Sequence, residues 1–103
     1  MGKAIRWGII GSGGWADHTF APAIVAANGS KLCAVLGPTM KDSESFCSRH
    51  NINLAYSDLS KFVSDESIDA IWVAGPNHMH KAFSIAALES GKHVLCENQW
   101  PYL

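Results

Sequence analysis

The stretch AIRWGIIGSGGWA, residues 4–16, carries the strongest indication of fold in this chain. Residues 4–11 form a near-continuous apolar run that ends in glycine, which is typical of a parallel strand buried on both faces. A glycine cluster follows, and helical spacing begins directly after it. A buried strand, a glycine-rich turn and a helix in this order predict the start of an alternating β/α fold.

Strands and helices alternate along the rest of the chain. Further strands are predicted at residues 32–37, 54–56, 68–75 and 93–96. Helices are predicted at residues 15–28, 40–50, 58–64 and 77–90. This alternation predicts a doubly wound α/β sheet of about five mostly parallel strands, joined by right-handed crossovers.

Local signals refine the predicted helices. Pro22 predicts a kink or a fresh start in the first helix, because proline cannot donate to the carbonyl four residues back. Thr39 precedes the second helix, and its spacing to Asp42 is that of a capping box. The residues expected to face inward are Met40, Ser43, Phe46, Cys47 and His50 in the second helix, Leu59, Phe62 and Val63 in the third, and Met79, Ala82, Phe83, Ala86 and Leu88 in the fourth.

Composition narrows the class of protein. The chain has 103 residues, 48% hydrophobic content and a formal charge of −1, as expected for one globular domain. Because it has no basic cluster, no nucleic-acid-binding face is expected. No segment approaches the ~20 apolar residues that span a bilayer, and the N-terminal run is too short for a signal peptide, so a cytoplasmic location is expected. Cys33, Cys47 and Cys96 lack metal-ligand spacing, and each is expected to be a small buried hydrophobe.

The first loop that can carry chemistry is GSGGWA, residues 11–16, which matches G-x-G-x-x-A. Gly11 permits the tight turn, Gly13 lets the backbone approach a pyrophosphate, and Ala16 lets the helix pack closely on the strand. Free N–H groups at the helix start attract phosphates. The strand–helix context favours dinucleotide binding over a purely structural turn. The predicted contacts are Gly11, Ser12, Gly13, Gly14 and Trp15.

The second loop bears on the choice of cofactor. In NAD-binding sheets an acid near this position binds the ribose hydroxyls, but here the strand leads into Gly37, and Asp42 lies beyond it in the helix. Without an acid a 2′-phosphate is not repelled, and Thr39 and Lys41 can hydrogen-bond to it, which favours NADP slightly over NAD. The alternative has equal weight: Thr39 is a helix cap and Lys41 a solvated surface charge.

The third loop, GPNHMH at residues 75–80, follows the fourth predicted strand. Its two histidines, His78 and His80, have no third ligand in view, so no metal site is predicted. A polar loop that lines the cofactor cleft is the favoured interpretation.

Three motifs together resemble the Gfo/Idh/MocA oxidoreductase family. They are GSGGWA, VAGPNHMH at residues 73–80 and AALESGKHVLCE at residues 86–97, and the resemblance covers residues 5–97. It implies an NAD(P)-binding Rossmann domain of an enzyme that moves hydride between the nicotinamide and a hydroxyl-bearing carbon, often of a sugar or polyol. The family's Pro-Asn-x-x-His pattern is matched by Pro76, Asn77 and His80. With Gly75 and Glu97, these residues complete the expected cofactor-binding set.

The resemblance stops after Glu97, where the family typically continues Glu-Lys-Pro and its lysine lies by the nicotinamide and substrate. Asn98 and Gln99 stand there instead, so no catalytic residue is assigned. Deleting one A from codons for Glu-Lys-Pro-Met-Ala-Leu yields Glu-Asn-Gln-Trp-Pro and then Tyr, as found at residues 97–102. A frameshifted tail is therefore one hypothesis, beside a divergent native tail and a boundary introduced by cloning.

The expected organisation is a Rossmann domain at residues 1–97 and an aberrant tail at residues 98–103, with the family's substrate domain missing. Such a chain is expected to bind NADP or NAD but to catalyse no reaction. Without the family's substrate domain, the apolar side chains of the last strand, Val94 and Leu95, are left with only Trp100 and Tyr102 to cover them. Marginal stability and self-association are therefore expected. The alternatives are a non-catalytic nucleotide-binding or sensor module and a poorly folding fragment.

Overall fold

The sheet has five strands, all parallel, in the order β3-β2-β1-β4-β5. The computed structural model describes residues 4–13, 16–74 and 77–96, without the side chains of residues 77–80 and 96. The strands are β1 (Ile5–Ile10), β2 (Ser30–Leu36), β3 (Leu54–Tyr56), β4 (Ala70–Val73) and β5 (His93–Cys96). The main helices are α1 (Ala21–Ala26), α2 (Met40–His50), α3 (Leu59–Val63) and α4 (Asn77–Glu89). The predicted doubly wound class is confirmed.

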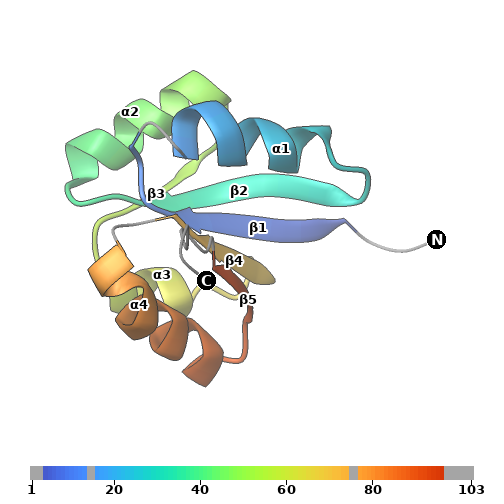
Figure 1. The fold of residues 1–103 in the computed structure, drawn as a ribbon. Coiled ribbons are helices and arrows are strands. Elements are labelled where there is room, and N and C mark those ends of the chain that lie inside the picture. The colour runs from blue at the N-terminus through green and yellow to red at the C-terminus, as the bar shows by residue number, and fades with distance from the viewer. Residues whose placement is uncertain (1–3, 14–15, 75–76, 97–103) are drawn as a thin grey trace.

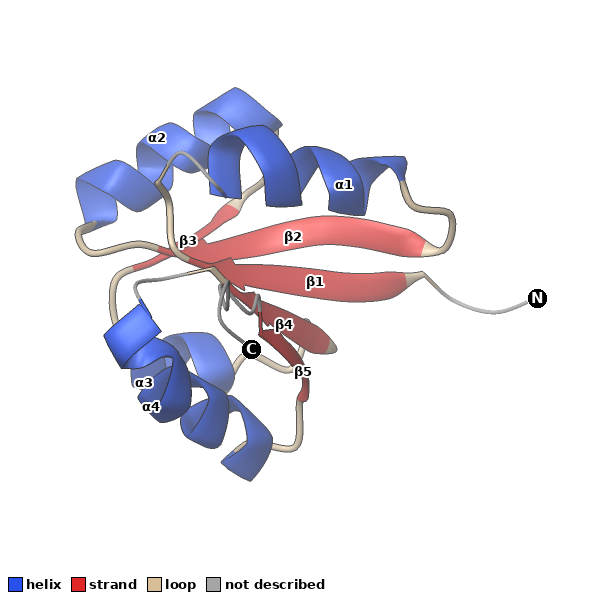
Figure 2. Ribbon diagram, in the orientation of Figure 1, coloured by secondary structure: helices blue, strands red, loops and turns tan. Residues whose placement is uncertain are grey.

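Helices cover both faces of the sheet. Figure 1 shows α1 and α2 together on one face, and α3 and α4 on the other. Figure 2 shows the same three layers by type of structure, with the strands between two pairs of helices. Strands buried between two helical layers need apolar side chains on both faces, which explains the continuous apolar runs in the sequence.

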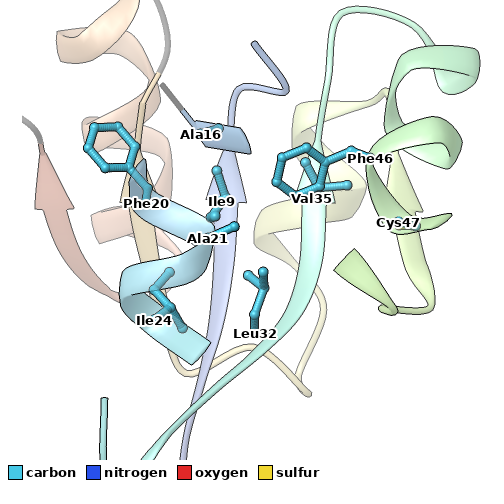
Figure 3. Close-up of a cluster of buried hydrophobic side chains, with 9 residues drawn as sticks. All are labelled: Ile9, Ala16, Phe20, Ala21, Ile24, Leu32, Val35, Phe46 and Cys47. Atoms are coloured by element: carbon cyan, nitrogen blue, oxygen red, sulfur yellow. The ribbon is translucent and has the colours of Figure 1, made fainter. Parts of the chain in front are cut away.

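Each face of the sheet has its own hydrophobic core. In the core under α1 and α2, Ile9 and Leu32 of the sheet belong to one cluster with side chains of both helices, which Figure 3 shows. In the other core, Ile71 and Val73 pack with Phe62 of α3. A side chain at Gly8 would bring its Cβ to 2.7 Å from the Phe62 ring, so this ring can lie against β1 only because residue 8 is glycine.

The helical segment after the glycine loop consists of two parts. Ala16–Phe20 forms a π-helical turn, and α1 begins at Ala21 with Pro22 in its first turn. The predicted fresh start at Pro22 is confirmed, since proline is tolerated where its missing N–H has no helical acceptor. The helix ends at Ala26, earlier than the predicted residue 28, because Ala27 is extended.

Three residues predicted to face inward are exposed instead. Met40 is 42% exposed, because it is the first residue of α2. In α4, Leu88 is 60% exposed and Ala82 is also exposed, whereas Ala87 is fully buried. Phe83, Ala86 and Ala87 follow helical spacing, while residues 82 and 88 lie beyond the edges of that stripe. The inner face of α4 therefore contains Phe83, Ala86 and Ala87.

Each cysteine was predicted to be a small buried hydrophobe; Cys47 is buried, but Cys33 is only half-buried. The register between β1 and β2 shifts at Trp7 and Gly8, which leaves Cys33 as the extra residue of a bulge. Its thiol donates to the Trp7 carbonyl at 3.3 Å. Burial raises the pKa of both Cys33 and Cys47, so both thiols stay protonated near neutral pH. The side chain of Cys96 is not among those that the structure describes.

Among the residues that the structure describes, no helix is long and apolar enough to cross a membrane.

Candidate functional site

The strand order reverses beside β1, which makes this edge of the sheet the expected ligand site. From β1 the chain proceeds through β2 to β3 on one side, and β4 and β5 lie on the other. Two backbone hydrogen bonds fix the carboxyl ends there: Gly11 N–H donates to the Leu36 carbonyl and Ala74 N–H to the Ile10 carbonyl, both at 2.8 Å. The loops that follow β1, β2 and β4 therefore begin side by side, as doubly wound sheets require at a ligand crevice.

The glycine loop leaves β1 with the geometry that its sequence predicts. Gly11 has a φ of 114°, a conformation that favours glycine. Gly13 is exposed, and a Cβ there would meet nothing within 4 Å. Asp17 N–H donates to the Gly13 carbonyl at 2.9 Å and so joins the loop to the helical segment. The backbone at Gly13 is therefore open to a ligand, while Gly11 and Asp17 are held by backbone hydrogen bonds.

Gly37 lies directly beside the glycine loop. A Cβ at Gly37 would be 2.7 Å from Ser43 Oγ and 3.0 Å from Ser12 Oγ. The structure thus brings Ser12 and Gly37, which come from different loops, into one place. Ser43 is fully buried and bridges two strands: its Oγ accepts from Gly37 N–H at 2.8 Å and donates to the Tyr56 carbonyl at 2.6 Å.

Thr39 has the capping role that was one of its two interpretations. Its Oγ1 accepts from Asp42 N–H at 3.1 Å at the start of α2. A capping hydroxyl still has its own hydrogen to donate, so this role leaves Thr39 able to bind a phosphate oxygen. Lys41 is exposed one turn from this cap. Both residues lie at the same edge as Gly37.

Part of the predicted site lies outside the described residues. This holds for Gly14, Trp15, Gly75, Pro76, Glu97 and Asn98. Asn77 begins α4 and His80 lies in its first turn, but their side chains are not described. Within the described ranges, no three His, Cys, Asp or Glu side chains are grouped to hold a metal ion.

One charged cluster, formed by Asp17, Arg49 and His50, was not predicted from the sequence. The Asp17 carboxylate accepts from Arg49 Nε at 3.0 Å and from His50 Nε2 at 2.5 Å. Burial raises the pKa of Asp17, but the hydrogen bonds from His50 and Arg49 outweigh it, and the pKa lies below its usual range. Asp17 belongs to the first turn after the loop, and its two partners to the last turn of α2.

A second polar cluster lies on the α3 side of the sheet. The Tyr56 hydroxyl donates to an Asp65 carboxylate oxygen, and Ser67 donates to the other through its N–H and its hydroxyl. The bond to Asp65, followed by burial, raises the pKa of Tyr56 to about 12. Lys92 Nζ donates to the Asp65 carbonyl at 2.8 Å. This cluster holds the turn between α3 and β4.

Comparison with known proteins places these features in a family context. Residues 5–98 match the model of the GFO_IDH_MocA oxidoreductase family, described as an NAD-binding Rossmann fold. The chain is 33% identical over 93 residues to the scyllo-inositol 2-dehydrogenase (NADP(+)) IolU of Bacillus subtilis, covering 90% of this chain and 28% of the relative. It is 29% identical over 92 residues to a 1,5-anhydro-D-fructose reductase of Ensifer adhaerens, covering 89% and 27% respectively.

A solved structure has the same fold. KijD10 is a 3-ketoreductase from Actinomadura kijaniata whose crystal structure contains TDP-benzene and NADP. It superposes with a TM-score of 0.88 at 26% identity, covering 94% of this chain and 30% of KijD10. The chain thus spans less than a third of the length of each of these three proteins.

Proposed function

The chain belongs to the Gfo/Idh/MocA oxidoreductase family, of which it forms the NAD-binding Rossmann fold, and on this premise we propose that it binds NADP(H) more tightly than NAD(H). The proposed contacts are those predicted from the sequence: Gly11, Ser12, Gly13, Gly14 and Trp15 in the first loop, Gly37, Thr39 and Lys41 in the second, and Gly75, Pro76, Asn77, His80 and Glu97 at the third loop and the end of β5. The proposed domain boundary stays at residue 97.

The open backbone at Gly13 is the observation that carries the proposal. The residues present fit a dinucleotide, because a Cβ at residue 13 meets no protein atom and its space is available to a phosphate group. A helical segment begins at Ala16, three residues after Gly13, and N–H groups at the start of a helix attract phosphates. When bound, the nicotinamide supplies or accepts hydride, while these residues bind and orient the phosphates.

Gly37 supports the preference for NADP. An acid at this position would repel a 2′-phosphate and bind the ribose hydroxyls of NAD instead. Any side chain at Gly37 must displace the hydroxyls of Ser12 and Ser43, and Ser43 Oγ is held by two hydrogen bonds. The packing around Gly37 therefore opposes an acid there, and Thr39 and Lys41 remain available to a phosphate.

We further propose that the full-length parent oxidises or reduces a sugar-like or polyol substrate. IolU is named for an inositol and the Ensifer adhaerens relative for an anhydro sugar. Because this chain spans under a third of their length, the substrate-binding groups are assigned to the remainder of the parent. The 103-residue chain is proposed to bind cofactor without turnover.

Self-association is proposed at the flank of β5. Val94 packs into the core on the α4 side, and strand side chains alternate, so Leu95 faces the opposite side of the sheet. There it is 46% exposed, next to Trp72 of β4. Apolar side chains exposed on a sheet at its edge strand favour association between copies.

Calorimetric titration tests the cofactor proposal. NADP+ and NAD+ are each titrated into the purified chain, whose cooperative unfolding is first verified by circular dichroism. Saturable binding of both, tighter for NADP+, is expected. The absence of binding to folded protein would overturn the proposal, whereas tighter binding of NAD+ would overturn only the preference.

A further inference from the structure

Asp17 is an acid in the first turn after the loop that is proposed to hold the phosphates. It is four residues from Gly13, and its N–H closes the loop by bonding to the Gly13 carbonyl. A pyrophosphate at this loop is itself anionic, so an unpaired carboxylate here would repel it. An acid in the first turn of a helix is favourable to the helix dipole. The helix dipole therefore explains an acid at residue 17, but it does not explain why this acid pairs with a cation of α2.

Three contacts hold the Arg49 side chain in place. Its Nε donates to Asp17 at 3.0 Å, its Nη1 donates to Ser45 Oγ at 2.8 Å, and its guanidinium lies 5.7 Å from the ring centre of Phe46. His50 packs on the same ring, at 4.4 Å between centres. Because a carboxylate only accepts hydrogen bonds, His50 Nε2 carries the hydrogen in its contact with Asp17.

Phe46 makes the arrangement rigid. It is fully buried in the core beneath α1 and α2, where Figure 3 shows it beside Val35 of β2. The charged pair therefore sits over a fixed part of the core rather than on a loose surface. A preorganised pair loses less side-chain entropy than an ordinary exposed one, so its effect on a nearby anion is maintained.

We propose that Arg49 is a positioning residue of the cofactor, which acts through Asp17 by cancelling the carboxylate charge beside the bound phosphates. The inference rests on the proposed dinucleotide binding and adds a residue that the family motifs do not contain. Arg49 touches no cofactor atom in this account. Its effect on affinity is electrostatic, and it depends on the Asp17 carboxylate, which holds the guanidinium in place.

The test is a double-mutant cycle read as the Kd for NADPH, measured by fluorescence titration at low salt. Arg49→Ala is expected to weaken binding roughly three- to tenfold, the size of one poorly screened charge near an anion. Arg49→Lys keeps the positive charge and is expected to restore most of the affinity. Asp17→Asn removes both the repulsive charge and the ion pair that holds the guanidinium, so in this background Arg49→Ala is expected to have a much smaller effect.

Arg6→Ala is the matched control. It breaks another arginine–aspartate pair, in which Arg6 Nη2 lies 2.8 Å from Asp69, but at the amino ends of β1 and β4. Its Kd is expected to equal that of the wild type. Raising the salt concentration is expected to shrink the Arg49→Ala defect, since salt screens exposed charges.

Each outcome separates this inference from the proposed function. No NADPH binding to folded wild-type protein overturns both. A wild type that binds and an Arg49→Ala variant with unchanged Kd overturn the inference alone. An Arg49→Ala defect of the same size in the Asp17→Asn background also overturns it, because Arg49 would then act directly or through the fold.

Discussion

The backbone N–H of Gly37 donates to the side-chain oxygen of Ser43 at 2.8 Å, and this bond ties the turn after β2 to the interior of α2. A serine on the inner face of a helix costs stability unless its hydroxyl is satisfied. Here the hydroxyl both accepts from Gly37 and donates to the end of β3. A buried polar residue thereby sets the shape of a loop proposed to hold the cofactor.

Gly37→Ala is expected to destabilise the fold. Its Cβ would lie 2.7 Å from Ser43 Oγ, which cannot move without losing its hydrogen bonds. Overpacking of this kind costs about 1–3 kcal/mol, which urea unfolding would measure. Gly13→Ala is the control, since a Cβ there meets nothing within 4 Å. Equal stability of the two variants would contradict the packing argument.

Gly13→Val is expected to abolish NADP(H) and NAD(H) binding while the chain stays folded. The new side chain meets no protein atom at its Cβ, yet it fills the space assigned to the pyrophosphate. Calorimetry would report the loss of binding, and circular dichroism the retained fold. A valine variant that binds with wild-type affinity would show that the phosphates lie elsewhere.

Tyr56→Phe is expected to change stability at high pH. The pKa of Tyr56 is raised to about 12 in the fold, above the value near 10 of an unfolded chain. The hydrogen bond to Asp65 therefore stabilises the fold fully below pH ~10, and its contribution is lost as the pH rises toward about 12.

The measurement compares urea unfolding of both proteins from neutral pH to about pH 12. The phenylalanine variant is expected to be less stable near pH 8 by about 1–2 kcal/mol. It should also lose less stability than the wild type between pH ~10 and ~12. Because the ring remains to pack on Phe62, parallel curves for the two proteins would rule out the hydroxyl as the cause.

Leu95→Lys is expected to reduce self-association. It places a charge on the exposed side chain next to Trp72 at the flank of β5. Sedimentation velocity over a range of concentrations is expected to show less of the larger species. Val25→Lys, which changes an exposed residue of α1, is the control and should leave the distribution unchanged. A strictly monomeric wild type would disprove the association.

The 103-residue chain is expected to show no dehydrogenase activity toward inositols or sugars, even with Asn98→Lys. A single charged group adds little when nothing positions the substrate against the nicotinamide. Nicotinamide absorbance with NADP+ and each substrate is the readout. Measurable turnover by this chain alone would overturn the assignment of substrate binding to the remainder of the parent.

The fold was predictable because its signals are local and redundant. The apolar run before Gly11 and the proline at residue 22 each predicted a feature that the structure contains. Inner faces were predicted less well where size and spacing disagree, as for Leu88 and Ala87. Spacing fixes which way a helical side chain points, and bulk does not.

The site was predictable only where a backbone motif defines it. Gly11 and Gly37 stand at turns whose geometry the sequence indicates. The partnership of Asp17 with Arg49 joins residues 32 positions apart, and no local pattern reveals it. Likewise, the sequence around Cys33 is typical of a core residue. The bulge that leaves Cys33 half-buried depends on how β1 and β2 pair, and neither strand's sequence indicates it.

The position of β1 also has a consequence for how the chain is made. It leaves the ribosome before the other four strands of the sheet, yet it lies in the middle of the sheet, and Arg6 can pair with Asp69 only after 63 more residues are made. Until β4 emerges, one edge of β1 remains unpaired and apolar, which is the kind of edge that recruits other chains. Slower translation across residues 40–70 would therefore be expected to increase aggregation during synthesis and leave the stability of the finished protein unchanged.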